Sequence, residues 1–488
     1  MPADDVLGYA RAHRARALDE LKHFVAHASV SAQPAQAGAV TRCARWLAQH
    51  LRGIGLVDAR VIATQGHPIV YASLRSGAGR GSVRPSLLIY GHYDVQPADL
   101  SEGWHAPPFA PIVRGDHLYG RGASDDKGQM FVFVKAIEAY LRQRGRLPID
   151  VVCLFEGEEE IGSPNLLAFV SRHRQALRCD AAVMADATMA NASRPALVYA
   201  MRGALYLELV VHGPRHDLHS GNFGGVVLNP LQALCELLAG LHDARGHIAI
   251  PGFYDRVRRY TPQQRRLLSR DAPSDAMIAS DAGIARPWGE AGFSLYERLA
   301  LRPALTINGL RGGYAGPGSK GVIPATALAK LSFRLVPDQD PREVERLLRR
   351  HLAARMPTAI RAELRTLSAA RPAQMDPHHP VLTAATQACQ RAFGVRPALL
   401  RGGGTIPALH CFDRVLGVQT ALLGFAPTDA RLHAANEKLH LPTFDKAVAA
   451  AIELFDAFAA AAAPARYGMD VEGEHRNLRP LMEMHDDH

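Results

Sequence analysis

The order of apolar and polar positions predicts alternating helices and short buried strands in about the first 200 residues. Residues 1–60 carry apolar positions at helical spacing and predict one or two amphipathic helices. Four later runs are short and apolar, as buried strands are. They are residues 71–74, 86–90, 149–155 and 180–185.

The stretch between the second and third runs, "KGQMFVFVKAIEAYLRQRG", predicts a helix. Its apolar side chains Phe131, Val134, Ile137 and Leu141 recur at helical spacing, which predicts one buried face. Gly145 is expected to end the helix. Strands and helices that alternate at this spacing predict an α/β layer around a largely parallel sheet.

The pattern changes near residue 203 and changes back near residue 373. "ALYLELVVHG" alternates like a half-exposed strand, residues 226–300 are largely helical and polar, and residues 330–337 predict another strand before an amphipathic helix. We therefore predict one discontinuous domain, formed by residues 1–202 and 373–465. Residues 203–372 would form an inserted α+β domain, and the polar tail 466–488 is left unassigned.

Composition supports an ordinary globular protein of more than one domain. The chain has 488 residues, of which 48% are hydrophobic and 21% are charged. No apolar run reaches the roughly 18 residues that span a bilayer, and the charged N-terminal segment has no signal-peptide core. We therefore expect a cytoplasmic protein without a membrane partner.

Charge and cysteine content exclude two other classes. The net charge of +9 comes mainly from arginines spread along the chain, without a basic run interleaved with aromatic residues. This pattern indicates composition rather than nucleic-acid binding. None of the six cysteines forms a CxxC pair, which argues against a disulfide framework and against a thiolate zinc site.

Acidic and histidine residues follow the ends of the predicted strands. They lie in four clusters: His92-x-Asp94, Asp125-Asp126, Glu158-Glu159-Glu160 and Asp186. Each cluster alone is weak evidence, because an acidic triplet is usually surface charge. The carboxyl ends of parallel strands meet at one edge of a sheet, so these clusters are expected to converge.

Converging carboxylates predict a metal centre, because they cannot all stay ionised without a cation. Oxygen and imidazole ligands without thiolates suit zinc, manganese or cobalt. Two metals would need one bridging carboxylate. His92 would bind a metal through one ring nitrogen, and Asp94 would accept from the other and fix its orientation.

Four motifs together resemble the M20 metallopeptidases, in the branch of cytosolic dipeptidases that includes carnosinase. They are "GHYDVQP", "LYGRGASDDKGQM", "EGEEEIGS" and "GPGSKGVIP", and the resemblance runs from about residue 10 to 460. It implies a zinc-peptidase-like α/β catalytic domain with an inserted α+β lid and dimerisation domain. It also implies a homodimer and two divalent metal ions, Zn or Mn, with Co possible.

The resemblance implies a complete set of metal ligands. Asp125 resembles the bridging carboxylate. His92 and Asp186 would complete one metal site, and Glu160 and His433 the other. The family has serine before its last acidic ligand, whereas this chain has alanine at position 185.

The resemblance also implies catalytic and substrate-binding roles. Glu159 resembles the general base that activates a metal-bridging hydroxide. His219, in "DLHSGNFGG", resembles a histidine that reaches the partner subunit's active site and stabilises the oxyanion. Arg334 resembles an arginine that clamps a substrate carboxylate. Backbone that could approach the ligand comes from two glycine loops, at Gly316, Gly318, Gly403 and Thr405.

The favoured function is hydrolysis of dipeptides. A second hypothesis is an M20 deacylase of N-acyl amino acids, which would use the same ligands. A third is a binding protein on the same fold that has lost catalysis. Glu158 has no assigned role in any of the three.

Overall fold

The computed structural model describes residues 3–75 and 84–467. The predicted tail 466–488 therefore lies outside the described residues from position 468 on. The first two positions of that tail belong to the last helix, α14 (Leu441–Tyr467).

A nine-stranded sheet forms the centre of the first domain, in the order β1-β2-β6-β3-β7-β17-β8-β15, with β16 paired to β8. Its strands are β1 (Arg60–Ile62), β2 (Ile69–Leu74), β3 (Ser86–His92), β6 (Asp150–Glu156), β7 (Ala181–Thr188), β8 (Ala196–Met201), β15 (Ala373–Gln374), β16 (Ala398–Gly402) and β17 (Thr420–Ala426). The four apolar runs seen in the sequence lie in β2, β3, β6 and β7.

The sheet is mixed: the prediction of a largely parallel sheet holds for the central strands and for the β8–β16 pair, but it was wrong for the other outer pairs. The central strands β6, β3, β7 and β17 are parallel to their neighbours in that series. On one side β2 and β1 are antiparallel, and on the other β8 is antiparallel to β17 and to β15. β1 and β2 are joined by a short connection, which permits antiparallel pairing but not the crossover that parallel strands need.

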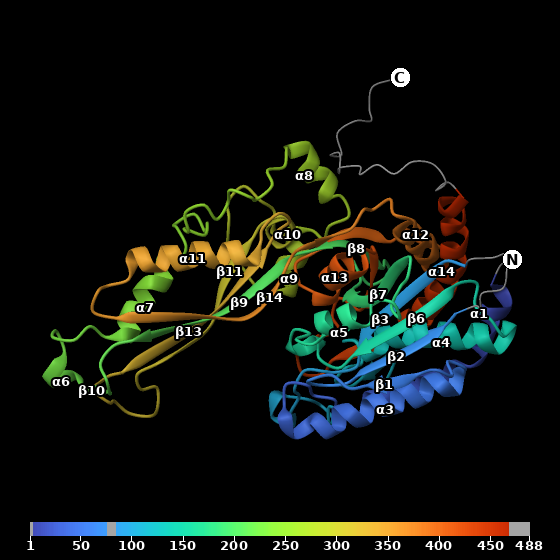
Figure 1. Ribbon diagram of the computed structural model, residues 1–488, viewed down its shortest axis with the longest axis horizontal. Helices are drawn as coiled ribbons and strands as arrows, with labels where there is room; N and C mark the ends of the chain where they lie inside the picture. The colour runs from blue at the N-terminus through green and yellow to red at the C-terminus, as the bar shows by residue number, and fades with distance from the viewer. Residues whose placement is uncertain (1–2, 76–83, 468–488) are drawn as a thin grey trace, which may run out of the picture.

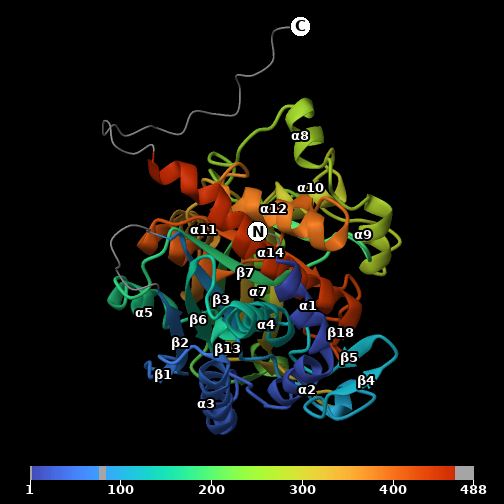
Figure 2. The ribbon, with the colours of Figure 1, turned by 90° about the vertical axis from the view of Figure 1, so that its right-hand side faces the viewer.

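Helices pack on this sheet and on one another (Figures 1 and 2). They are α1 (Asp4–Ala12), α2 (Arg14–Val25), α3 (Ala37–Ile54), α4 (Lys127–Arg144), α5 (Leu166–Arg172), α12 (Pro380–Phe393), α13 (Pro407–Cys411) and α14. Short helical turns lie between these elements and the strands: η1 (Pro34–Gln36), η2 (Leu100–Glu102), η3 (Glu159–Ile161) and η4 (Phe412–Leu416). A small sheet of β4 (Ile112–Arg114), β5 (His117–Tyr119) and β18 (Lys438–His440) lies beside them.

Helix α4 differs from its prediction in one respect. Gly145 ends it with a positive φ of 64°, as expected of a glycine C-cap. However, every residue from Lys127 to Tyr140 is buried, not one face alone. α4 contacts β3 and β7 as well as α1, α2, α3 and α14, so neighbours surround it. A helix surrounded in this way holds its N-terminal end firmly in place.

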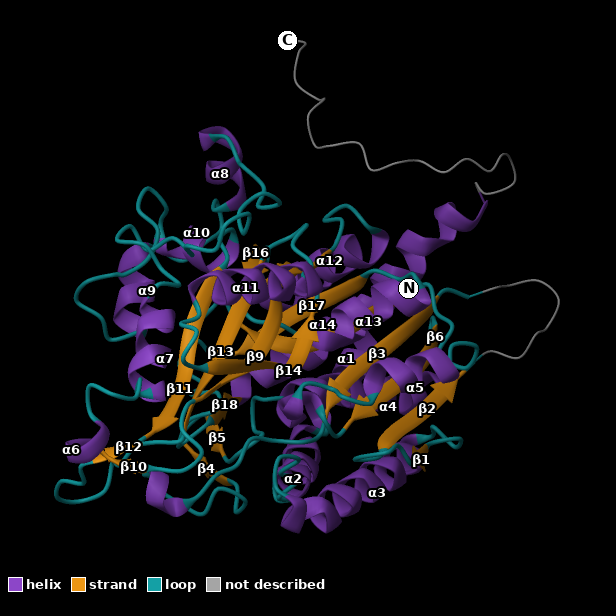
Figure 3. Cartoon of the chain, turned by 60° about the vertical axis from the view of Figure 1, so that its left-hand side comes forward, coloured by secondary structure: helices purple, strands orange, loops and turns teal. Residues whose placement is uncertain are grey.

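The inserted domain is built on a four-stranded antiparallel sheet in the order β11-β13-β9-β14 (Figure 3). Its strands are β9 (Gly203–His212), β11 (Ala304–Gly312), β13 (Thr326–Leu335) and β14 (Arg361–Ala370). Alternate residues of β9 are buried against helices α7 (Pro230–Ala239) and α11 (Pro341–Arg355), which confirms the alternation read from the sequence.

The remaining elements of the inserted domain lie at its margins. α8 (Pro262–Leu268), α9 (Asp275–Asp281) and α10 (Leu295–Ala300) occupy the stretch predicted to be helical and polar. β10 (Leu218–His219), β12 (Val322–Ile323) and α6 (Ser220–Phe223) form the tip farthest from the large sheet (Figure 1). The α/β fold with an α+β insertion is therefore confirmed. The exact boundaries at 202/203 and 372/373 remain a prediction; they fall between β8 and β9 and between β14 and β15.

Within the described ranges, no helix combines the length and the apolar character that crossing a bilayer requires.

Candidate metal centre

The predicted ligands converge at one edge of the large sheet. β3 ends at His92, and Asp186 lies near the carboxyl end of the parallel neighbour β7. Glu160 lies in η3, just after β6, which is also parallel to β3. Asp125 precedes α4, and His433 lies in the loop between β17 and β18. Parallel strands bring their carboxyl ends to the same edge, which explains the convergence.

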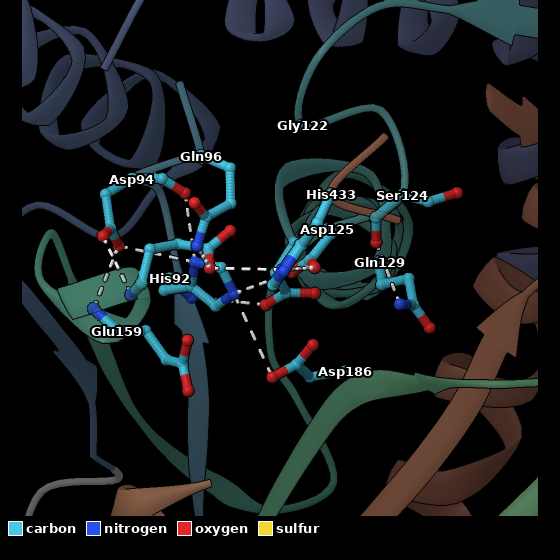
Figure 4. Close-up of polar contacts among 12 residues, drawn as sticks. His92, Asp94, Gln96, Gly122, Ser124, Asp125, Gln129, Glu159, Asp186 and His433 are labelled. Carbon is cyan, nitrogen blue, oxygen red and sulfur yellow. Dashed lines mark hydrogen bonds and ion pairs between the residues drawn. The ribbon is translucent and has the colours of Figure 1, made fainter. Parts of the chain in front are cut away.

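Asp125 lies between two histidines (Figure 4). Its Oδ1 is 3.2 Å from Nε2 of His92, and its Oδ2 is 2.9 Å from Nε2 of His433. Nε2 of His92 is also 4.0 Å from Oδ2 of Asp186, and Nε2 of His433 is 3.3 Å from Oε2 of Glu160. The five side chains thus form two groups that share one carboxylate.

Each group has the dimensions of a metal site. In both groups the potential ligand atoms lie within 4.8 Å of one another. Nε2 of His92 is buried and makes no hydrogen bond within the described part of the chain, even to the nearby Asp125 oxygen. An imidazole and a carboxylate that face each other without a hydrogen bond fit ligands of a common ion. Imidazole and oxygen donors suit zinc, manganese or cobalt.

The electrostatics of the cluster favour a cation. Burial raises the pKa of Asp186 far above its usual value, and the neighbouring Asp126 and Asp125 raise it further. The carboxylates of Asp125 and Glu160 beside His433 raise the pKa of this histidine to about 10. A metal ion in the same place would displace that proton and compensate the carboxylates.

Asp94 supports both halves of the centre. Nδ1 of His92 lies 3.1 Å from the backbone oxygen of Asp94 and 3.4 Å from its Oδ1, which fits the orienting role predicted from the sequence. The same carboxylate also accepts hydrogen bonds from the backbone N–H groups of Glu159 and Glu160, at 3.2 and 3.1 Å. Ser31 Oγ donates to it at 2.6 Å. Asp94 therefore connects the strand of His92 to the turn that carries Glu160.

The three consecutive glutamates lie in three different environments. Glu160 belongs to a ligand group and accepts a hydrogen bond from Gln96 Nε2 at 2.7 Å. Glu159 points toward the cluster, but its carboxylate belongs to neither group (Figure 4). Glu158 is buried on the other side, where it accepts from the backbone N–H of His67 at 2.9 Å and from Asn165. The triplet is not a patch of surface charge.

Burial raises the pKa of Glu159 well above its usual value, and the charges of Asp186 and Glu160 raise it further, against the opposing effect of His92. A carboxyl group with a raised pKa is a better proton acceptor than an ordinary glutamate. Its position beside both ligand groups, without being part of either, suits a general base.

Three polar residues that contact a ligand or the turn beside it were not predicted from the sequence. Gln96 donates to Glu160, as described above. Glu437 accepts hydrogen bonds from the backbone N–H groups of Ser124 and Asp125, and Gln129 donates to the backbone oxygen of Ser124. A signal was present for Glu437, because it is an acidic residue only four positions after His433. Gln96 lies within the quoted motif "GHYDVQP" but was given no role.

The predicted substrate-binding residues fall into two separate groups. One lies where β13 meets the loop after β16. There Arg334 Nη1 donates to Thr405 Oγ1 at 2.8 Å, and Nη2 donates to Tyr206 OH at 3.0 Å. Arg202 Nε donates to the backbone oxygen of Gly403 at 2.9 Å. Among the described residues, Arg334 has no carboxylate within ion-pair distance, so its charge is available to a ligand.

The other group lies at the tip of the inserted domain. β10 ends at His219 and pairs with β12, which follows the loop containing Gly316 and Gly318. His219 is exposed, and its Nδ1 accepts a hydrogen bond from the backbone of Gly221 at 3.0 Å. Figure 1 shows β10 and α6 at the end of the molecule remote from β3 and β7. The fold of one chain therefore does not bring His219 to its own metal cluster.

An α/β domain with a two-part cluster of histidine and carboxylate ligands at the sheet edge is the arrangement of a two-metal hydrolase. Residues 88–459 match the model of peptidase family M20/M25/M40, so the chain belongs to this family.

Two curated relatives cover most of the chain. Cys-Gly metallodipeptidase DUG1 of Candida albicans is 31% identical, over 88% of this chain and 91% of the relative. Beta-Ala-His dipeptidase of Rattus norvegicus is 30% identical, over 88% of this chain and 90% of the relative. Among solved structures, the dipeptidase Dug1p of Saccharomyces cerevisiae has a TM-score of 0.85 and 26% identity, covering 94% of this chain and 99% of that one.

Proposed function

We propose that this protein is a dipeptidase that uses two divalent metal ions, Zn or Mn, with Co as a third candidate. The observation that carries the proposal is the position of Asp125, whose two oxygens face two different histidines. The relatives described above carry dipeptidase names, which favours dipeptides over N-acyl amino acids. The intact ligand set argues against a binding protein that has lost catalysis.

In the proposed mechanism, the residues of this chain hold the reactants and move one proton. When bound, the two metals would polarise the scissile carbonyl and lower the pKa of an attacking water. Glu159 accepts the proton of that water on its carboxylate and transfers it to the leaving amine nitrogen. Arg334 holds the substrate carboxylate through its guanidinium.

The basic test combines metal analysis with a substrate panel. The wild-type protein should bind two equivalents of Zn or Mn, hydrolyse dipeptides, and lose activity in EDTA. Tripeptides and N-acyl amino acids should be poorer substrates. Faster hydrolysis of N-acyl amino acids than of dipeptides would favour the deacylase hypothesis instead.

The proposed location of the enzyme is the cytoplasm, which agrees with six free cysteines.

Removal of the Arg334 charge should abolish the preference for a free substrate carboxylate. Wild type is expected to cleave a dipeptide much faster than its C-terminal amide. In Arg334→Met, kcat/KM for the free dipeptide should fall about 10- to 100-fold, the usual value of a hydrogen bond to a charged group. In the same variant, kcat/KM for the C-terminal amide should change little. Steady-state kinetics on the matched pair of substrates measure both effects.

Lys330→Met is the control for Arg334→Met, because Lys330 is an exposed cation on the same strand, β13. Its removal should leave both rates unchanged. If wild type cleaves the dipeptide and its amide equally well, Arg334 does not bind the carboxylate.

We further propose a homodimer in which His219 acts in the partner's active site. β10, which ends at His219, lies at the end of the molecule remote from β3 and β7, which supports a role of His219 in the site of a second chain. His219→Ala should lower kcat about 100- to 1000-fold, as loss of an oxyanion donor does. After subunit exchange with inactive Glu159→Ala, about one quarter of wild-type activity should return, since half of the dimers are mixed and each has one repaired site.

The mixing experiment has an internal control. Asp125→Ala and Glu159→Ala remove groups of the same site in the same chain, so their mixed dimers should remain inactive. Differently tagged chains show by co-purification that exchange has occurred. Mixed His219→Ala and Glu159→Ala dimers that form but stay inactive would mean that His219 does not act across the interface.

A further inference from the structure

A fully buried carboxylate lies beneath the turn that carries Asp125. Glu437 Oε1 accepts hydrogen bonds from the backbone N–H groups of Ser124 and Asp125, at 2.8 and 3.0 Å. Its Oε2 accepts from the backbone of Gly122 at 3.0 Å and from Arg121 Nη1 at 2.8 Å. Burying a carboxylate is unfavourable unless it is hydrogen-bonded, and these four donors compensate that cost.

A second buried side chain holds the same turn from the other direction. Gln129 Nε2 donates to the backbone oxygen of Ser124 at 2.9 Å (Figure 4). Its Oε1 accepts from the backbone N–H groups of Phe425 and Ala426, at 2.9 and 3.1 Å, at the end of β17. The turn before α4 is thus tied to the chain segment that leads toward His433.

These two contacts enclose the loop of His433. The loop leaves β17 at Ala426, where Gln129 binds it, and ends at Glu437. The His433 side chain is 55% exposed, so packing restrains it far less than it restrains the fully buried His92. Its backbone φ of 59° lies in the left-handed region, which is uncommon for a residue other than glycine. The loop that holds this conformation is anchored at both ends by Gln129 and Glu437.

We propose that Glu437 is a positioning residue that fixes the Asp125 turn relative to the His433 loop, and so sets the geometry of the shared carboxylate in both metal sites. This inference rests on the proposed two-metal function. Residues that orient metal ligands usually change metal affinity by about 10- to 100-fold when they are replaced. The site held by Asp125, Glu160 and His433 should be affected most, because its histidine is the exposed one.

The competing explanation is that Glu437 serves only to neutralise the buried Arg121. Arg121 is 1% exposed, and its guanidinium lies over the Trp104 ring at 5.3 Å. However, only one of the four hydrogen bonds of Glu437 involves Arg121, and the other three bind the backbone of the turn. Variants can therefore separate the two roles.

Four variants make the test: Glu437→Gln, Arg121→Met, the double variant, and Glu138→Gln. A glutamine at 437 presents an amide group to two of the four donors, so two hydrogen bonds are lost in either orientation. In the double variant no buried arginine charge is left unpaired, so folding should be preserved even if Glu437→Gln alone folds poorly. Glu138 is a buried carboxylate in α4, paired with Lys135 and outside both ligand groups, and serves as the matched control.

The main measurement is the Kd of Mn²⁺ or Zn²⁺ by competition with a chelator, with the visible spectrum of Co²⁺ as a report on ligand geometry. In Glu437→Gln and in the double variant, the metal ion that is bound with the lower affinity should bind about 10- to 100-fold less tightly than in wild type. Both variants should also show an altered Co²⁺ spectrum. Arg121→Met and Glu138→Gln should keep wild-type affinity. In EDTA, amide hydrogens of residues 122–125 should exchange faster in Glu437→Gln than in wild type.

The outcomes distinguish this inference from the function on which it rests. Wild-type protein that binds fewer than two metal ions would contradict the two-metal function and this inference together. Wild type with two metals and a Glu437→Gln variant of unchanged affinity would contradict the inference alone. Recovery of wild-type affinity in the double variant would show that Glu437 only balances the charge of Arg121.

Discussion

Glu159→Ala is expected to lower kcat by about 10²- to 10⁴-fold, the usual contribution of a general base, while two metal ions stay bound. Glu159 points toward the cluster but belongs to neither ligand group, so its removal leaves all five ligands in place. The measurement pairs steady-state kinetics on one dipeptide with metal analysis of the same preparation.

The two glutamates on either side of Glu159 carry the same side chain and serve as controls. Glu160→Ala should lose the metal held with His433, because Glu160 is a ligand candidate of that group. Glu158→Gln should retain metals and most activity but melt at a lower temperature, because one of the two carboxylate oxygens that accept from His67 and Asn165 becomes an NH2 donor. If Glu159→Ala instead loses a metal, the proposed roles of Glu159 and Glu160 must be exchanged.

The parts of the metal centre that could be predicted from the chain are those marked by local patterns. His92 and Asp186 each follow an apolar run that forms a buried strand, and a strand end is visible in the sequence. His433 lies in a loop without periodicity, so only the resemblance to M20 peptidases pointed to it. The position of a residue just after a strand can be read from the neighbouring sequence. The residues that a loop side chain contacts in the fold cannot.

The contacts that join distant segments around the ligands were not predictable in this way, although the role of Asp94 beside His92 was. Asp94 reaches the backbone of Glu159 and Glu160 across 65 and 66 positions, and Glu437 reaches Asp125 across 312. No window of local sequence contains such a contact. A lone buried glutamate has the same sequence appearance as an exposed one, and only the tertiary structure shows which backbone groups it binds.

The fold also shows how far local periodicity can predict burial. The alternation in β9 predicted a strand with one covered face correctly, because a period of two depends only on the strand itself. The helical spacing in α4 predicted one buried face, yet the helix is buried on all sides from Lys127 to Tyr140. Periodicity shows which positions are apolar, but the number of neighbouring helices is set by the packing of distant segments.

Replacement of Asp125 with alanine is expected to remove both metals and all measurable turnover. Asp125 is the one residue shared by the two ligand groups. Without it each group keeps one histidine and one carboxylate, and the acids that remain lose the shared cations that compensate them. Dialysed protein should therefore contain close to no metal, and activity should not return when metal is added in moderate excess.

Thermal unfolding gives a readout of this loss that does not depend on activity. A metal present at about 100 times its Kd stabilises the native state by about 2.7 kcal/mol, so wild type should melt at a higher temperature with Mn²⁺ than with EDTA. Asp125→Ala should melt at the same temperature in both. Asp126→Asn is the control, since Asp126 is also buried and accepts a hydrogen bond from the His92 backbone at 3.2 Å but belongs to neither ligand group. An Asp125→Ala protein that keeps two metals, beside an Asp126→Asn protein that loses them, would assign the bridge to Asp126.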